Sequence, residues 1–437
     1  MRDLYSRRNV IKIGLGGMVS VAAVGLVGCD SVVPSSAQNA SISMHLAFWG
    51  TATRDKLTKK AIGMFHEQHP TITITSSYTA FNKFWPALDT NIAAKNVPEL
   101  FQMDMRYLSK YVRSGLMLDM TQLIYDQTID LSDFDPLMLA GSKANNSIYG
   151  IPLGGNYQCL IYDTVLLAQA GVGTLPATLT WDDYSRYTTE IAKAFKKKVY
   201  GSADSSGDIS VFEIWVRQRG KELYTVDGRL AFNIQDVEDW FEYWNTLRTT
   251  GGCVPANIQA AASGASGPTN SSLAHGQAVF ALPHSNEFEA YQALVKHKLD
   301  FLSIPSGPQP GLYFKPSQLL SISAQTPFVT QAASFVDFLI NDPNGIKSIG
   351  IERGIPGSQK AQVLLAPGLT NAQKQEVAFT NAISAGNTIR VKEVLDPPQA
   401  SQIATIFGNE AGHVGAKKAS VATAAQNFYK AAQQLLV

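Results

Sequence analysis

The sequence predicts an α/β protein of two interleaved lobes around a hinged cleft. The first observation is a strand–helix–strand pattern, in which residues 43–49 and 71–75 alternate apolar and polar side chains and the stretch between them has helical apolar spacing. The second is the length of 437 residues, which argues for two or three folded units at roughly 100–200 residues each. The third is a set of Gly- and Pro-rich breaks at 150–155, 305–316 and 353–357. Three chain crossings imply lobes that share backbone segments and can open and shut as a hinge.

The first block continues as alternating strands and helices. Pro70 ends the first helix, because proline lacks the backbone N–H that an interior helical position donates. A second helix is expected within 85–95, followed by a third strand over 100–103. Consecutive strands that helices connect run parallel, so we expect a parallel sheet here.

The second block repeats this alternation. It is expected to begin with a strand over 158–162 and a helix over 164–170. Gly171 ends that helix, since glycine accepts the left-handed conformation common after a helix. Thr180 is positioned as the N-cap of the next helix, whose first turn carries two acids at the positive end of the helix dipole.

The remaining elements complete both lobes. Three more strands and a helix are expected over 278–282, 300–304, 319–323 and 328–340, followed by a helical tail. One apolar stripe at helical spacing is best explained as core, and its members are Val237, Trp240, Phe241, Trp244 and Leu247. The first lobe is expected to comprise residues 42–153 and 317–352, and the second lobe residues 154–316 and 353–437.

The first 28 residues are predicted to be an export signal rather than part of the fold. Four basic residues accompany an uncharged apolar run of 15 residues, Ile13–Val27. That run is too short to span a bilayer stably, which takes about 20 residues. Arg7 and Arg8 lie in a twin-arginine pattern, which indicates export by that route, with the general secretory route left open.

Cys29 follows Leu26-Val27-Gly28, and this segment resembles a bacterial lipobox. We therefore expect cleavage before Cys29, lipidation of its thiol, and a flexible tether over 29–41. The alternative is a signal anchor with an incidental cysteine. A lipid anchor would hold the exported protein on the outer face of the cell membrane, or in the periplasm if the cell has two membranes.

Composition argues against several classes of function. Lys+Arg 36 against Asp+Glu 35 gives a net charge of +1, so no basic excess suits a nucleic acid. The chain has no phosphate-binding loop, serine-nucleophile elbow or H-E-x-x-H motif, and we expect no catalysis, cofactor or metal. His66 and His69 are better explained as a solvated helix face, because a zinc site needs three or four ligands. Cys159 and Cys253 are expected to be small buried hydrophobes, with one disulfide between them left open.

A series of local patterns covers residues 43–357. The patterns are Trp49-Gly50, Ala93–Leu100, Ser147–Pro152 with Leu160–Asp163, Ala170-Gly171 with Thr180–Asp183, Gly276–Phe280, Ala333–Leu339 and Gly354–Pro356. In their order and spacing they resemble the carbohydrate-type extracellular solute-binding proteins of ABC importers, the maltose-binding-protein-like group. The resemblance implies a type II periplasmic-binding-protein-like fold.

The same resemblance implies a function. The chain would be a monomeric lipoprotein that captures a sugar or oligosaccharide outside the cell and delivers it to the permease subunits of an ABC importer. An amino-acid receptor would need an arginine near the strand ends, and none stands out. A secreted carbohydrate-active enzyme and a surface sensor with the same fold stay open as alternatives.

Residues that bind sugar are expected on loops after the C-terminal ends of strands, where aromatic faces and polar groups can meet a ligand. Trp49, Asn82 and Asp104 follow the first three strands. Each has a structural alternative: strand-end packing for the tryptophan, a turn for the asparagine and a helix N-cap for the aspartate.

Further candidates come from the crossings and the second lobe. Asn156 and Tyr157 follow the first crossing and Tyr313 lies at the second, with hinge packing as the alternative for both tyrosines. Trp215 lies on a predicted helix, where core packing is the alternative. The strand over 278–282 is followed by His284, Asn286 and Glu287. A surface histidine remains the alternative for His284.

Overall fold

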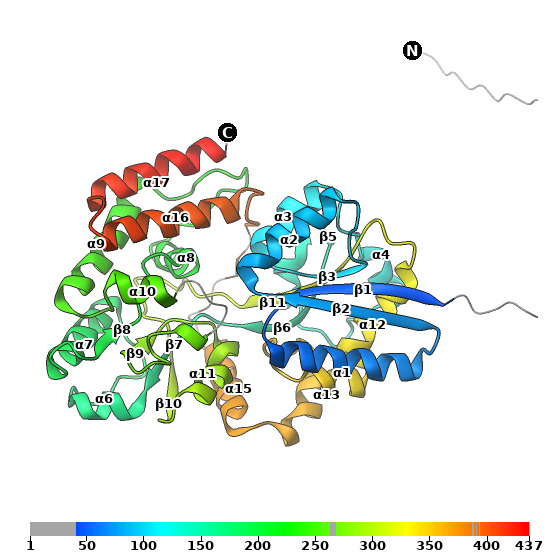
Figure 1. Cartoon of the computed structure of the whole chain (residues 1–437), viewed down its shortest axis with the longest axis horizontal. Helices are drawn as coiled ribbons and strands as arrows, with labels where there is room; N and C mark the ends of the chain where they lie inside the picture. The colour runs from blue at the N-terminus through cyan, green and yellow to red at the C-terminus, as the bar shows by residue number, and fades with distance from the viewer. Residues whose placement is uncertain (1–40, 263–267, 387–388, 390, 393, 437) are drawn as a thin grey trace, which may run out of the picture. The chain divides into compact units, whose positions relative to one another are not determined.

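The computed structural model describes residues 41–262, 268–386, 389, 391–392 and 394–436. The predicted export signal, Cys29 and the tether up to residue 40 lie outside the described residues. Two sheets, one of five strands and one of four, organise the described chain (Figure 1). We call the elements around the five-stranded sheet the first lobe and those around the four-stranded sheet the second lobe.

The five-stranded sheet has the strand order β2-β1-β3-β11-β6. Its strands are β1 (Ile42–Trp49), β2 (Ile72–Thr79), β3 (Leu100–Met103), β6 (Ile151–Asn156) and β11 (Lys315–Ile322). β1 pairs parallel with β2 and β3, as the strand–helix–strand pattern predicts. β11 runs antiparallel to both β3 and β6, so the sheet is mixed and the expected parallel arrangement holds only for its first three strands.

The four-stranded sheet has the order β10-β7-β9-β8. Its strands are β7 (Cys159–Asp163), β8 (Tyr200–Ser202), β9 (Ala278–Ala281) and β10 (Leu299–Ser303). Only β8 and β9 pair parallel in it. A separate two-stranded pair consists of β4 (Lys143–Ala144) and β5 (Ser147–Ile148).

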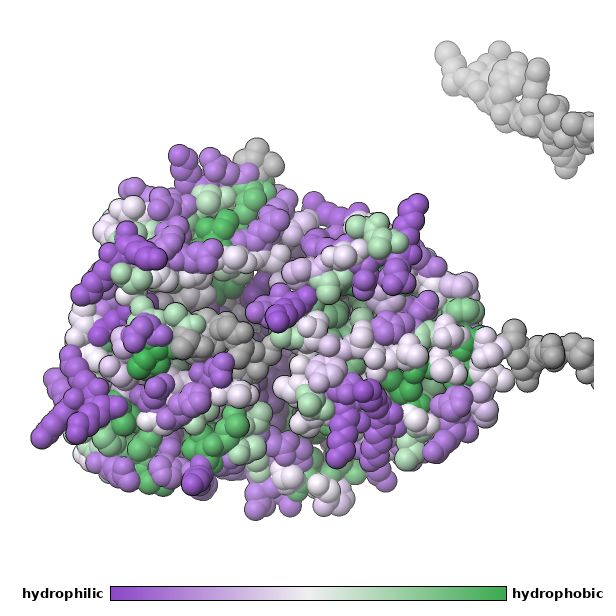
Figure 2. Space-filling view, in the orientation of Figure 1, coloured by the Kyte–Doolittle hydropathy of each residue, from purple (hydrophilic) through white to green (hydrophobic). Residues whose placement is uncertain are grey.

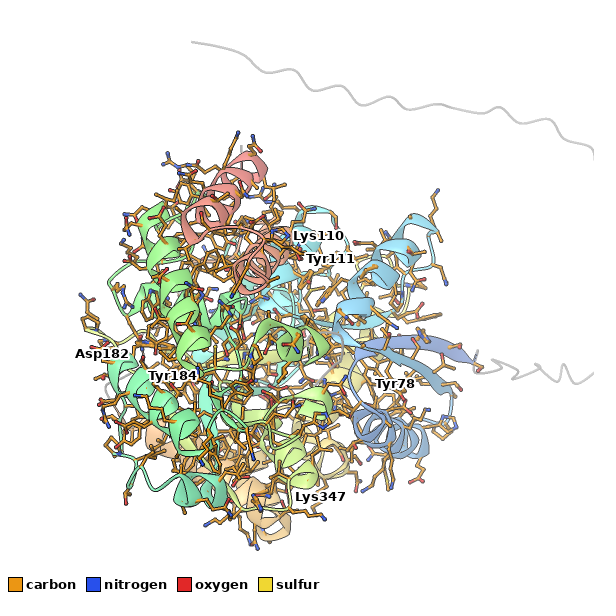
Figure 3. The ribbon with its side chains drawn as sticks, turned by 60° about the vertical axis from the view of Figure 1, so that its left-hand side comes forward. Tyr78, Lys110, Tyr111, Asp182, Tyr184 and Lys347 are labelled. Atoms are coloured by element: carbon orange, nitrogen blue, oxygen red, sulfur yellow. The ribbon has the colours of Figure 1, made fainter. Side chains whose placement is uncertain are left out.

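Helices pack around the first sheet. They are α1 (Ala52–Gln68), α2 (Phe81–Ala93), α3 (Met105–Arg113), α4 (Thr121–Tyr125), α5 (Pro136–Leu139), α12 (Val329–Asn341), α13 (Pro343–Ile349) and α14 (Gln359–Leu365). α3 begins where the carboxylate of Asp104 accepts a hydrogen bond from the backbone N–H of Arg106, 2.9 Å away. Further along α3, the ammonium group of Lys110 lies 4.8 Å from the ring centre of Tyr111 (Figure 3).

The second lobe contains most of the remaining helices. They are α6 (Thr164–Ala170), α7 (Trp181–Ala194), α8 (Ile209–Arg217), α9 (Ile234–Thr250), α10 (Ala256–Ala262), α11 (Phe288–Leu294), α15 (Asn371–Ser384), α16 (Ala400–Gly415) and α17 (Val421–Leu435). Thr180 forms the predicted N-cap of α7 in a capping box with Asp183. Gly171 follows α6 in the left-handed conformation, with φ 65°. On α7, Tyr184 is buried while Asp182 is exposed at the surface (Figure 3).

The chain passes between the lobes three times. β6 lies in the first sheet and β7 in the second, and the return passage runs from β10 to β11. The third passage follows α14, because α14 packs on α13 whereas α15 packs on α11 and β10. The lobe boundaries expected from the sequence stay a prediction.

The glycines at 154 and 155 belong to strand β6 rather than to a break between elements, which corrects the expectation for 150–155. A Cβ atom at Gly154 would lie 2.8 Å from the backbone of Arg353 and Gly354. A Cβ atom at Gly155 would lie 2.3 Å from the ring of Phe314. Glycine is needed at 154 because another segment of backbone lies directly against the strand, and at 155 because the ring of Phe314 does, not because the chain turns.

The largest apolar core fills the second lobe and contains the predicted helical stripe of α9 together with Trp181 and Trp215. Trp240 and Trp244 are fully buried, so their interpretation as core is confirmed. Cys159 and Cys253 are buried and free of any disulfide. None of the described helices is both long and apolar enough to cross a bilayer. On the face shown in Figure 2, apolar residues occur in small groups between hydrophilic ones.

Candidate functional site

A cavity of about 760 Å³ is lined by residues of both lobes. The first lobe contributes residues that follow β1 and β3 and that begin α2. The second lobe contributes the start of α8, the segment after β9 and one residue of α15. The passage strands β6 and β11 line it as well. The cavity therefore lies where the strand ends and the interlobe passages meet.

Seven of the ten predicted ligand-binding residues line this one cavity: Trp49, Asn82, Asp104, Asn156, His284, Asn286 and Glu287. They come from segments more than two hundred residues apart in sequence. The rule that ligand-binding groups follow the C-terminal ends of strands thus correctly predicted that these residues lie together. Their role in binding stays a prediction.

The other three predicted residues do not line the cavity. The hydroxyl of Tyr157 lies 3.0 Å from Ser384 Oγ, and its ring packs on Phe314. The hydroxyl of Tyr313 donates a hydrogen bond of 3.0 Å to buried Glu213. For both tyrosines, packing beside the interlobe passages is the better interpretation.

Trp215 belongs to the core of the second lobe instead of the cavity. Its ring centre lies 5.2 Å from that of Trp181 and 5.3 Å from that of Trp240. The guanidinium of Arg219 covers its outer face, 3.4 Å from the ring centre. No face of this indole is left for a ligand in the cavity.

Trp49 forms the aromatic part of the cavity wall, and its ring also packs against other aromatic rings. Its ring centre lies 5.3 Å from those of Phe81, Phe84 and Trp85, and only 7% of the residue is exposed. Phe81 lines the cavity beside it. Trp85 in turn stacks on Tyr107 with ring centres 3.5 Å apart. The cluster holds the indole in one orientation at the cavity edge.

Gly50 directly follows Trp49, the last residue of β1, and has close neighbours. A Cβ atom at Gly50 would lie 2.5 Å from the side chain of Arg54, so the glycine makes room for an arginine rather than for a ligand. Arg54 donates to the carbonyl oxygen of Trp49 at 2.9 Å and forms an ion pair with Glu352 at 2.8 Å. Both charged groups line the cavity.

A second ion pair joins the N-terminus of α3 to strand β11. Lys315 Nζ lies 3.2 Å from the carboxylate of Asp104. Burial opposes ionisation of Asp104, but Lys315 and Arg106 outweigh it and lower its pKa to about 2. Arg106 also donates to Ser210 Oγ on α8 at 2.8 Å, which connects the two lobes across the cavity. Asp104 is therefore both the N-cap of α3 and a charged residue of the cavity wall.

On the second-lobe wall of the cavity, burial is the main cause of the pKa shifts. Burial, reinforced by Lys315, lowers the pKa of His284 to about 3, so its imidazole is neutral at physiological pH. Burial raises the pKa of Glu287, although the backbone N–H of His284 donates to its carboxylate at 3.2 Å. Burial also raises the pKa of Glu376 well above its ordinary value, helped by the nearby charges of Glu289 and Glu352.

Three buried side-chain oxygens in the cavity wall have no hydrogen-bond partner among the described residues: Asn156 Oδ1, Gln318 Oε1 and Glu376 Oε1. Gln318 also has a φ of +53°, which an L-residue seldom adopts. Backbone strain of this kind concentrates at ligand sites. An unpaired buried acceptor costs about 1–3 kcal/mol, which a ligand hydroxyl in this cavity could offset.

Sequence reasoning missed the cations and one carboxylate. Arg54, Arg106 and Lys315 all line the cavity, although no loop arginine stood out near the strand ends, because both arginines lie in the first turn of a helix. The signal for Arg106 was available, because it follows β3 by three residues. Glu376 comes from a tail of which only helicity was expected, and no local pattern marks it.

The residues that line the cavity suit a neutral organic ligand better than a metal. Within the part of the chain that the structure describes, no cluster of three or more His, Cys, Asp or Glu side chains could hold a metal ion. Aromatic faces suit the C–H faces of a sugar ring, and amides and carboxylates suit its hydroxyls. Arg54 and Lys315 are paired with carboxylates of the same wall, Glu352 and Asp104, so their charges are balanced within the cavity.

Comparison with known proteins gives the family. The model of the bacterial extracellular solute-binding protein family matches residues 60–374 of this chain. A Brucella abortus (strain 2308) protein named as a binding protein is 24% identical over 201 residues, which are 44% of this chain and 46% of that protein. The chain thus matches about half the length of that curated relative.

Solved structures share the fold over nearly the whole chain. An extracellular solute-binding protein from Alicyclobacillus acidocaldarius is 28% identical, with 90% of this chain and 98% of that chain covered and a TM-score of 0.67. A periplasmic oligogalacturonide-binding protein from Yersinia enterocolitica, in complex with saturated digalacturonic acid, is 22% identical. Its coverage is 90% of this chain and 98% of that chain, with a TM-score of 0.79.

Proposed function

The chain belongs to the bacterial extracellular solute-binding protein family, and we propose that it captures a sugar or oligosaccharide outside the cell for import. The observation that carries the proposal is one cavity that holds both an aromatic wall, Trp49 with Phe81, and unpaired polar acceptors on β6 and β11. An aromatic face and hydroxyl-binding groups together are what a sugar requires. The digalacturonic acid in the Yersinia neighbour supports the same ligand class.

The proposed mechanism is closure of the two lobes on the ligand. The cavity draws residues from both lobes, and Arg106 already reaches Ser210 across it. A ligand favours the closed state only through contacts that the open state lacks. Groups on opposite lobes, such as Asn82 and Asn286, would provide those contacts.

Delivery to ABC permease subunits and retention at the membrane complete the proposal. Lipidation of Cys29 would keep the monomeric protein close to the permease, and residues 29–41 would give it reach. Radiolabelled palmitate should label the wild-type protein in cells of its source. The Cys29→Ala variant should remain unlabelled and appear in the medium or the soluble fraction.

The decisive experiment is a binding titration of the purified protein with neutral and uronic sugars, by calorimetry and thermal shift. A ligand at 100 times its dissociation constant should stabilise the protein by about 2.7 kcal/mol. Trp49→Phe should weaken sugar binding roughly tenfold through the loss of ring area, and it should also lower the melting temperature because only 7% of Trp49 is exposed.

Trp215→Phe is the matched control, because it makes the same exchange in the core away from the cavity. It should lower the melting temperature and leave sugar affinity unchanged. Equal effects of both variants on affinity would remove Trp49 from the site. A melting shift by peptides or polyamines, with none by any sugar, would overturn the ligand class.

A carbohydrate-active enzyme is distinguished by turnover. Asp104 and Glu287 line the same cavity and their pKa values are displaced in opposite directions, a feature of acid–base pairs. Binding without chemistry predicts that an oligosaccharide incubated with the protein is recovered intact. Product formation that Glu287→Gln abolishes would replace capture by catalysis.

A further inference from the structure

A second cavity, of about 770 Å³, lies in the second lobe. It is lined by residues that follow β8 and β9 and by helices α10 and α16, which pack against each other (Figure 1). Asp208 and Glu287 line both this cavity and the one between the lobes. The two spaces therefore adjoin at these carboxylates.

The wall of the second cavity contains buried polar groups without partners. Arg248 is 92% buried, since 8% of its side chain is exposed, and its Nε donates to Asp204 at 2.7 Å. Its Nη1 has no hydrogen-bond partner among the described residues, and neither has the hydroxyl of Ser272, which is 1% exposed. Both residues line the cavity. Leaving such donors unpaired is costly, so a ligand that accepts from them would be favoured.

The shape of this cavity depends on α16. Gly408, Gly412 and Gly415 lie on one face of the helix, four and three residues apart, and all line the space. A Cβ atom at Gly412 would meet nothing within 4 Å. The absence of side chains on this face leaves room between α16 and the strand ends.

We propose that the second cavity binds further sugar units of an oligosaccharide whose first unit lies in the cavity between the lobes. This inference rests on the proposed function and narrows the ligand from a sugar to a chain of sugars. Each cavity falls within the roughly 300–1,000 Å³ that holds one small ligand, so two adjoining cavities suit a longer molecule. Arg248 and Ser272 donate, and Asp204 and Asn409 accept, so the recognised groups are ring and glycosidic oxygens and hydroxyls.

The test compares chain lengths. Affinities are measured by calorimetry for galacturonic acid to tetragalacturonate and for glucose to maltotetraose, with wild type and Gly412→Phe. The phenylalanine should fill the second cavity without touching the cavity between the lobes, and its helix propensity exceeds that of glycine. Gly63→Phe is the matched control, since Gly63 lies on α1 of the first lobe and a Cβ atom there also meets nothing within 4 Å.

Wild type should bind the tri- or tetrasaccharide at least about tenfold more tightly than the monosaccharide of its series. Gly412→Phe should remove that advantage and leave monosaccharide affinity within twofold, whereas Gly63→Phe should change neither. Ser272→Ala should also weaken only the longer chains, without loss of melting temperature. Equal affinity for all lengths, or a Gly412→Phe variant that keeps the advantage, would overturn the second site and leave sugar capture standing. Failure of every sugar to bind wild type would instead reject the proposed function.

Discussion

The ammonium group of Lys315 lies 3.2 Å from the carboxylate of Asp104. This ion pair connects strand β11 to the N-cap of helix α3. Lys315 and Asp104 side chains are only 17% and 11% exposed. Lys315→Met should therefore destabilise the protein by about 1–3 kcal/mol, because it removes one of the two cations beside a largely buried carboxylate, the other being Arg106. Guanidinium unfolding at pH 7 measures this.

Lys110→Met is the control for Lys315→Met. Lys110 pairs with Asp89 at 2.7 Å, but the two side chains are 37% and 47% exposed. Its loss should cost less than about 1 kcal/mol. If both variants lose the same stability, the pair at the cavity contributes no more than a surface pair.

His284 should make stability fall as the solution is acidified. Its pKa is lowered to about 3, while the unfolded chain protonates near 6.5. Between these values the unfolded state holds one more proton, so stability rises with pH across that window. His284→Asn should reduce the slope by up to about 1.4 kcal/mol per pH unit. Unfolding free energies at pH 7 and 5 give the slope, and an unchanged slope would mean that the imidazole is solvated.

Glu376 should make the protein less stable as the pH rises, the opposite of His284. Burial raises its pKa, so the folded state holds its proton at a pH where the unfolded chain has lost it. That contribution is complete below the unfolded pKa and is lost as pH rises through the folded one. Glu376→Gln should therefore stabilise the protein increasingly from pH 5 to pH 8, measured by thermal unfolding. A variant less stable than wild type at pH 8 would show that the charge has a favourable partner.

Gly154→Ala tests the contact between strand β6 and the segment at 353–354. The new methyl group would lie 2.8 Å from backbone atoms that have no flexible end to move. We expect a loss of roughly 1–3 kcal/mol from overpacking. Gly63→Ala, at an open helical position, should instead add about 0.5–1 kcal/mol. A neutral Gly154→Ala would mean that the passage is loose at this point.

Local patterns predicted the elements well because the forces that produce them are local. The alternation of 43–49 became β1, and the Thr180 cap and the Gly171 end formed as expected. The break expected at 150–155 was wrong because its glycines make room for long-range contacts, with the backbone at 353–354 and the ring of Phe314, that sequence does not reveal.

The cavity residues were predictable only in part. A strand end fixes where the next residues begin, which suffices for Trp49 and Asp104. It does not fix where the side chain of an aromatic residue on a helix or passage points, and Trp215 and Tyr313 turned to the core. Glu376 and Lys315 reach the cavity through tertiary packing alone, so the local sequence carries no sign of them.

Of the six tryptophans in the chain, Trp49 alone lines the cavity between the lobes. Each of the other five is at least 95% buried in a core. A molecule arriving in the cavity would change the surroundings of one indole and leave five as a constant background. The emission spectrum of the unlabelled protein should thus report occupancy directly.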